Sequence, residues 1–112
     1  MSGDPNYALA KLRDANYEMA RGPGNVNDRL REAFMKFHPV ADGDFPDHLA
    51  GDYRWVMFQL TKFKCPQDSS GDVAYTLSRI RRTTGVTIAA RLLYLESELA
   101  AYLDDANYDN SP

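Results

Sequence analysis

Apolar residues recur along the chain at steps of three and four positions, the spacing that places side chains on one face of an α-helix. Four such stretches are separated by segments rich in turn-forming residues, and no stretch alternates apolar and polar residues as a half-buried strand does. The sequence therefore predicts an all-α fold of about four helices. Residues 1–112 are expected to form a single helical domain with frayed termini at residues 1–4 and 104–112.

The first three predicted helices have local start and stop signals. Asp4 can accept hydrogen bonds from free backbone N–H groups and Pro5 fits the first helical turn, so a helix is expected to begin there and to end at Gly22. A second helix is predicted over residues 28–37 and a third from Asp47. Three short helices thus precede the long C-terminal pattern.

The third predicted helix is apolar on two sides. Leu49 begins a face that recurs at steps of four and three residues. At about 100° per residue, Phe58 points nearly opposite to Leu49, and Trp55 also lies off that face. A helix with two apolar sides is expected to be covered on both.

The last apolar pattern keeps one helical phase from residue 73 to residue 102. Because the phase does not change across Gly85, one long helix over about residues 72–103 is predicted, and a kink near Gly85 is a variant of it. The alternative is a helix-turn-helix broken at residues 83–86, in which the chain folds back and the second apolar face becomes ordinary core.

A helix of this length exceeds what its own domain can cover. About 32 residues would span roughly 48 Å, whereas a compact chain of this size has a radius of gyration of about 13 Å. Both sides of the helix carry large apolar residues, so an interface is predicted, most simply that of an antiparallel homodimer. The predicted partner-binding residues are Trp55, Phe58, Val86, Leu92, Leu93, Tyr94 and Leu95.

Charge is nearly balanced overall but unevenly placed. The chain has 13 Lys and Arg residues against 16 Asp and Glu residues, a formal net charge of −3. Residues 73–95 hold four arginines and no acid, whereas residues 96–112 hold five acids and no base. In an antiparallel pair of long helices the basic half faces the acidic end, and Arg79 and Arg82 are the candidate charge contacts.

The same arginines suggest an alternative function, that of a dimeric DNA-binding transcriptional regulator using the region from Arg79 to Arg91. Arg81 and Arg91 lie beside the apolar stripe and not with Arg79 and Arg82, so no single face follows a phosphate backbone. The chain is also acidic overall. Nucleic acid is therefore the less favoured partner.

Catalytic and metal-binding patterns are weak. Asp and His residues crowd residues 38–52, but their spacing matches no calcium loop, and a solvated acidic segment is the favoured interpretation. The single Cys65 supports neither an internal disulfide nor a zinc site, and no phosphate-binding glycine loop or dinucleotide fingerprint is recognised. The sequence predicts no catalytic residue, metal ligand or cofactor, and we expect no enzymatic activity.

The predicted function follows from the uncovered apolar surface. We expect a small helical regulatory protein that binds a larger protein as an adaptor, inhibitor or anti-activator and is itself a homodimer. The chain contains no apolar run of membrane-spanning length and no signal-peptide pattern at its start, which favours a cytoplasmic location.

Overall fold

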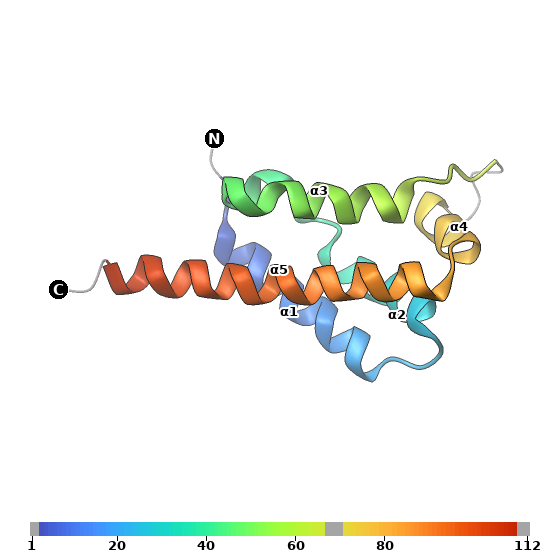
Figure 1. Ribbon diagram of the computed structural model, residues 1–112, viewed down its shortest axis with the longest axis horizontal. Helices are drawn as coiled ribbons and strands as arrows, with labels where there is room; N and C mark the ends of the chain where they lie inside the picture. Colours follow the sequence, from blue (N-terminus) through green and yellow to red (C-terminus); the bar gives the residue numbers. More distant parts are fainter. Residues whose placement is uncertain (1–2, 67–70, 110–112) are drawn as a thin grey trace.

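The computed structural model describes residues 3–66 and 71–109, and side chains as far as residue 106. Every regular element in this part of the chain is helical, which confirms the all-α prediction. The elements are α1 (Pro5–Arg21), α2 (Val26–Phe37), the short 3₁₀ helix η1 (Asp42–Asp44), α3 (Asp47–Thr61), α4 (Gly71–Arg79) and α5 (Arg82–Asp109) (Figure 1).

The first two helices begin at residues whose side chains cap them. The carboxylate of Asp4 accepts hydrogen bonds from the backbone N–H groups of Asn6 (3.0 Å) and Tyr7 (3.3 Å). At the start of α2, the side chains of Asn25 and Asp28 each accept a hydrogen bond of 3.1 Å from the other's backbone N–H. α2 therefore begins at Val26, before the predicted residue 28, because Asn25 is the cap and Asp28 lies inside the first turn.

Tyr53 on α3 anchors the segment that precedes this helix. Its hydroxyl donates a hydrogen bond of 2.5 Å to the carbonyl oxygen of Val40, and its ring stacks on Phe45 with 4.7 Å between ring centroids. Burial, together with the nearby carboxylate of Asp44, raises the pKa of Tyr53 well above its usual range. The hydroxyl therefore remains a protonated donor, and the segment is held against the core.

The predicted long C-terminal helix is confirmed as α5, but its continuity over residues 72–103 is wrong, because the chain leaves the helical conformation at residues 80–81. Asn27 on α2 stabilises the break: its side-chain amide donates to the carbonyl oxygens of Leu77 and Ile80, both at 3.2 Å. In a continuous helix these carbonyls would bond to the next turn. The spacing of apolar residues continues across the break, because it depends on which side chains are buried and not on the direction of the helix axis.

Gly85 marks neither the kink nor the alternative turn at residues 83–86. It lies in the first turns of α5, and its N–H donates to the carbonyl of Arg81 (3.1 Å). A Cβ atom at Gly85 would overlap the side-chain oxygen of Asn27 and come within 3.1 Å of Val26. Gly85 therefore lets α5 pack closely against the start of α2.

α4 is attached to the end of α3 mainly through polar bonds. The buried hydroxyl of Thr76 donates to the carbonyl of Phe63 and accepts from the N–H of the same residue, both at 3.1 Å. The N–H of Cys65 donates to Asp72 at 3.0 Å, which holds the pKa of that carboxyl below its usual range. Leu77 is the single fully apolar side chain that α4 buries among its described residues.

The helices form three layers, and the core lies where they meet. α3 and α5 run side by side in opposite directions, and α1 and α2 lie behind α5 in the view of Figure 1. The buried apolar side chains form one cluster to which all five α-helices contribute. Its largest fully buried apolar members are Leu12, Leu30, Phe37, Leu49, Val56, Leu60, Ile88, Leu92, Leu95 and Leu99.

α5 determines the elongated shape of the molecule. The described structure measures 55 × 30 × 19 Å, and the last turns of α5 extend beyond the other helices (Figure 1). The helix continues to Asp109, past the predicted end at about residue 103. The single-domain organisation and the fraying at residues 1–4 and 104–112 stay predictions, and residues 1–2 and 110–112 lie outside the described part.

Candidate interaction surface

One side of α5 is exposed and carries no charge. Val86 is 56% exposed, Leu93 58% and Tyr94 47%, although all three are large and apolar or aromatic. The residues of this side recur at helical spacing, and we call them the outer face of α5: Val86, Ala90, Leu93, Tyr94, Ser97 and Ala101. Because each of them is exposed, the outer face forms an uncharged stripe of about four helical turns.

The opposite side of α5 belongs to the core, and this corrects part of the predicted partner surface. Leu92 and Leu95 were assigned to a partner, but both are fully buried within the described chain. They form the inner face of α5 together with Ile88 and Leu99. A charge placed at Leu95 would therefore destabilise the core, and its effect could not be assigned to an interface.

The charged residues in the middle of α5 are turned to its two flanks. Arg91 points toward α3, where its Nη1 lies 2.6 Å from a carboxylate oxygen of Asp52, and its guanidinium lies 4.7 Å from the centre of the Trp55 ring. Glu96 points toward α1, where it accepts a hydrogen bond of 2.8 Å from the amide of Asn16. These contacts pair the guanidinium of Arg91 and the carboxylate of Glu96 on the two flanks, so the outer face between them stays uncharged.

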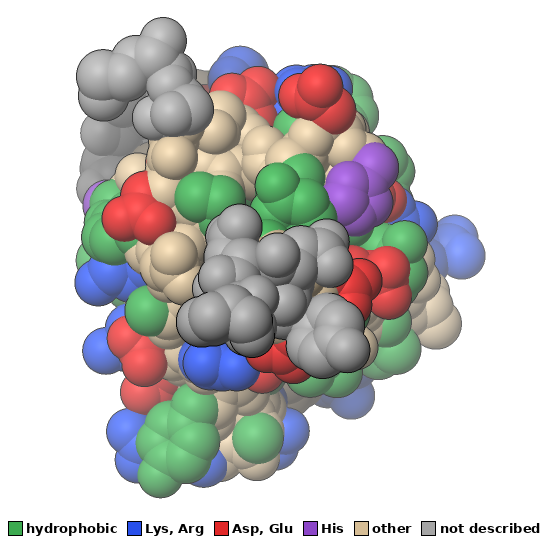
Figure 2. Space-filling view, turned by 90° about the vertical axis from the view of Figure 1, so that its left-hand side faces the viewer, with side chains coloured by type: hydrophobic (Ala, Val, Ile, Leu, Met, Phe, Trp, Pro, Cys, Tyr) green, Lys and Arg blue, Asp and Glu red, His purple; other side chains and the backbone are tan. Residues whose placement is uncertain are grey.

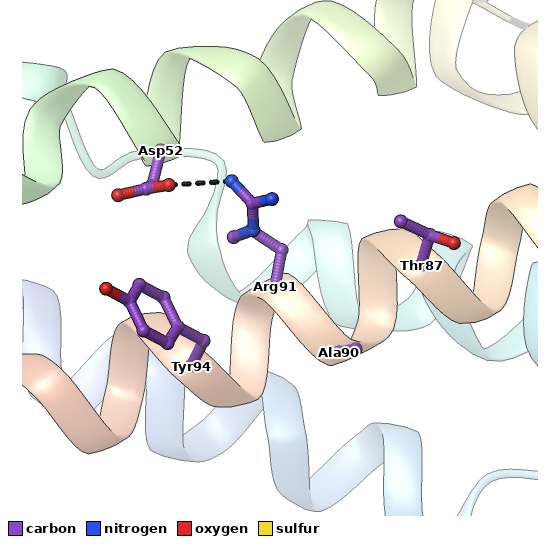
Figure 3. A pocket seen from close by; sticks show the side chains of 5 residues that line it. All are labelled: Asp52, Thr87, Ala90, Arg91 and Tyr94. Carbon is purple, nitrogen blue, oxygen red and sulfur yellow. Dashed lines mark hydrogen bonds and ion pairs between the residues drawn. The ribbon is translucent and has the colours of Figure 1, made fainter.

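A shallow open groove of about 410 Å³ runs between α3 and α5. Figure 3 shows Arg91 and Tyr94 rising from α5 toward α3, with Asp52 reaching toward Arg91 from the other side. Thr87 and Ala90 complete the lining. The groove contains no nucleophile beside a base, and its cation is already paired, so its chemistry is that of a binding surface.

Of the two predicted aromatic residues on α3, one is exposed and the other is not. Phe58 is 61% exposed, whereas Trp55 is partly buried against the core and covered by Arg91. Trp55 therefore lies at the edge of the groove, and Phe58 stands on the solvent side of α3. Tyr94 and Arg91 thus line the groove and Arg91 also covers Trp55, whereas Phe58 takes no part in this arrangement.

The four arginines of residues 73–95 have different surroundings: Arg79, Arg81 and Arg82 are exposed around the junction of α4 and α5, and Arg91 is half-buried. The guanidinium of Arg79 lies 5.3 Å from the Tyr75 ring centre and 5.8 Å from that of Phe63, whereas Arg82 is exposed at the start of α5. Arg91 is paired with an acid on another helix. Figure 2 faces the opposite end of the molecule, where α5 projects, and shows basic and acidic side chains interspersed on that end. With a net charge of −3 and Arg91 neutralised by Asp52, the exposed cations at the start of α5 reduce to Arg79, Arg81 and Arg82.

Three of the four carboxylates of the segment 38–52, those of Asp42, Asp44 and Asp52, have structural partners. Asp44 accepts hydrogen bonds of 2.9 Å from the N–H groups of both Ala41 and Asp4, and Asp42 forms an ion pair of 3.2 Å with Arg54. Among the described residues, no group of three or more His, Cys, Asp or Glu side chains is arranged to hold a metal ion. The acidic character of this segment is thus used within the fold.

Two features escaped the sequence analysis as sites. Met35 on α2 is 62% exposed, and a single exposed methionine gives no periodic signal by which to find it. Asn16 is buried and joins α1 to α5 by donating to the carbonyl of Leu92 (3.2 Å) as well as to Glu96. Its signal is a polar residue at an apolar position of the helical repeat, which identifies a buried hydrogen bond but not its partner.

Comparisons with known proteins leave the surface to be interpreted on its own. No protein-family model matches the chain, and no match was found among curated proteins or solved structures. Of the helices in the described ranges, none combines the length and the apolar character required to cross a membrane.

Proposed function

We propose that the chain is a small helical protein–protein interaction module that binds a larger protein as an adaptor, inhibitor or anti-activator, and that it is itself a homodimer. The outer face of α5 is the observation that supports this most directly. Its three large side chains stay exposed although the same helix packs a complete apolar face into the core. Large apolar side chains grouped on one surface are typical of protein-binding sites.

The form of the neighbouring groove supports a protein partner over a small molecule. Small-molecule sites usually enclose most of their ligand, whereas the groove between α3 and α5 is open along the outer face. Its strongest hydrogen-bonding group, the guanidinium of Arg91, is already engaged by Asp52. A regulatory binding role in the cytoplasm, without a cofactor, therefore remains the proposal.

The proposal is tested by capture experiments with the full chain and two matched variants. Leu93→Glu places a charge on the outer face, and Met35→Glu places the same charge on α2 at a residue of similar exposure. We expect wild type and Met35→Glu to retain one stoichiometric partner that Leu93→Glu loses, because the outer face supports the homodimer to which the larger protein binds. Retention of that partner by Leu93→Glu, with unchanged helical circular dichroism in all three chains, would contradict the proposed surface.

A gel-shift titration separates this proposal from the DNA-binding alternative. Random duplex DNA is added to the purified chain at low and at moderate salt. We expect no shift, because the chain is acidic overall and Arg91 is already paired with Asp52. A shift that weakens steeply with salt and is lost in Arg82→Ala would favour the alternative that uses the region from Arg79 to Arg91.

A further inference from the structure

We infer that a second copy of this chain occupies the outer face of α5, packed antiparallel, with the twofold axis passing beside the Leu93–Tyr94 peptide bond. This inference rests on the proposed function and specifies the geometry of its homodimer. It depends on three properties of α5: the order of large and small residues on its outer face, the charges at its two ends, and its length beyond the rest of the molecule.

The outer face is self-complementary when one copy is reversed. Val86 and Ala101 are equally far along the chain from the Leu93–Tyr94 bond, and so are Ala90 and Ser97. In the antiparallel pair, Val86 therefore lies at the height of the partner's Ala101, and Ala90 lies at the height of the partner's Ser97. A larger residue meets a smaller one at each end, which allows the two helices to approach to about 8 Å.

The two largest exposed residues lie at the axis. Leu93 is on the flank toward α1 and Tyr94 is on the flank toward α3, because adjacent residues are about 100° apart on a helix. A twofold axis between them brings Leu93 to the partner's Leu93 on one flank and Tyr94 to the partner's Tyr94 on the other. The tyrosine pair then lies at the mouth of the open groove between α3 and α5.

The charges at the ends of α5 select the antiparallel orientation. Arg82 begins the helix and Asp104 lies near its other end; both are exposed, and neither takes part in an ion pair within the described side chains. The two residues lie on the same flank of the outer face at about 100° per residue. Antiparallel packing places Arg82 beside the partner's Asp104 twice, whereas parallel packing would place like charges together.

The length of α5 leaves both charged ends accessible. Arg82 and Asp104 are separated by roughly 33 Å along the helix axis. The last turns of α5 extend beyond the other helices, so no element of the same chain covers the acidic end (Figure 1). A partner can therefore pack along the whole outer face without displacing a described element.

Oligomeric state and charge reversal test the pairing. Light scattering after size-exclusion chromatography is expected to give twice the 12.6 kDa chain mass for the full-length protein. Arg82→Asp alone and Asp104→Arg alone should each weaken dimerisation by about tenfold, and the double variant should restore it. Arg31→Asp, a reversal on α2 remote from the outer face, is the control and should have no effect.

Cysteine cross-linking tests the register, in a Cys65→Ser background. An equimolar mixture of Ala90→Cys and Ser97→Cys chains should form disulfide-linked pairs, whereas either variant alone should not, because like positions are roughly 10 Å apart along the axis. A strict monomer at high concentration overturns the inference, as does cross-linking of Ala90→Cys with itself. A monomer that still captures a partner through Leu93 overturns the second copy and the homodimer, and leaves the binding of a larger protein standing.

Discussion

Leu92 and Leu93 are neighbours in the chain, yet Leu92 is fully buried and Leu93 is 58% exposed. The difference is not one of chemistry, because the two side chains are identical. It comes from the position of α5, which inserts its inner face between α1, α2 and α3 and turns its outer face to solvent. Hydrophobicity in a helix therefore specifies that a face must be covered, while the tertiary fold decides which face the chain covers itself.

The largest effect is expected from truncation on the inner face. Leu95→Ala removes a fully buried side chain and leaves a cavity that the surrounding helices fill only in part. We expect the free energy of unfolding to fall by about 2–5 kcal/mol, measured by urea denaturation of the full chain. A loss below about 1 kcal/mol would mean that the inner face packs loosely and that the contrast between the faces is overstated.

A smaller effect is expected where α5 meets α2. In Gly85→Ala the new methyl group overlaps the side chain of Asn27, which must move and lose its bonds to the end of α4. The free energy of unfolding should fall by about 1–3 kcal/mol.

Gly51→Ala is the matched control for this substitution. Gly51 is also a helical glycine, but it lies on the exposed side of α3, where the nearest atom to a new Cβ is 3.8 Å away. We expect the control to gain about 0.5–1 kcal/mol from the higher helix propensity of alanine. Equal behaviour of the two variants would show that Gly85 is not needed for close packing.

The smallest effect is expected on the outer face. Leu93→Ala makes the same chemical change as Leu95→Ala but removes an exposed side chain. At a concentration low enough to keep the chain monomeric, the free energy of unfolding should change by less than about 0.5 kcal/mol. At high concentration the change should become destabilising, because dimerisation contributes there. A large loss at low concentration would place Leu93 in the core of the monomer.

The parts of the fold that were predictable from sequence are those specified locally. Asp4 and Pro5 determine the start of α1, and the start of α3 follows from Asp47 after a proline-rich segment. The break after α4 was missed because it depends on Asn27, which is far away in sequence and whose amide bonds reach the end of α4. No periodic pattern near residue 80 records that contact.

The candidate surface was predicted in part for a related reason. Four consecutive apolar residues, 92–95, span more than one side of a helix, so the sequence indicates two apolar faces without assigning each residue to one of them. Leu93 and Tyr94 proved to be exposed, whereas Leu92 and Leu95 lie in the core. The assignment requires the placement of α1, α2 and α3 around α5, which is a property of the whole fold.

The attachment of α4 by polar bonds has a consequence for the order in which parts of the molecule open. Thr76 and Asp72 hold this helix to the end of α3, and Leu77 is the main apolar side chain that it buries. Opening of α4 alone exposes Leu77 and the partly buried Val73, which is less apolar surface than global unfolding exposes, so urea changes its frequency less. We therefore expect α4 to open more often than the core unfolds, a difference that hydrogen exchange of its amides measures.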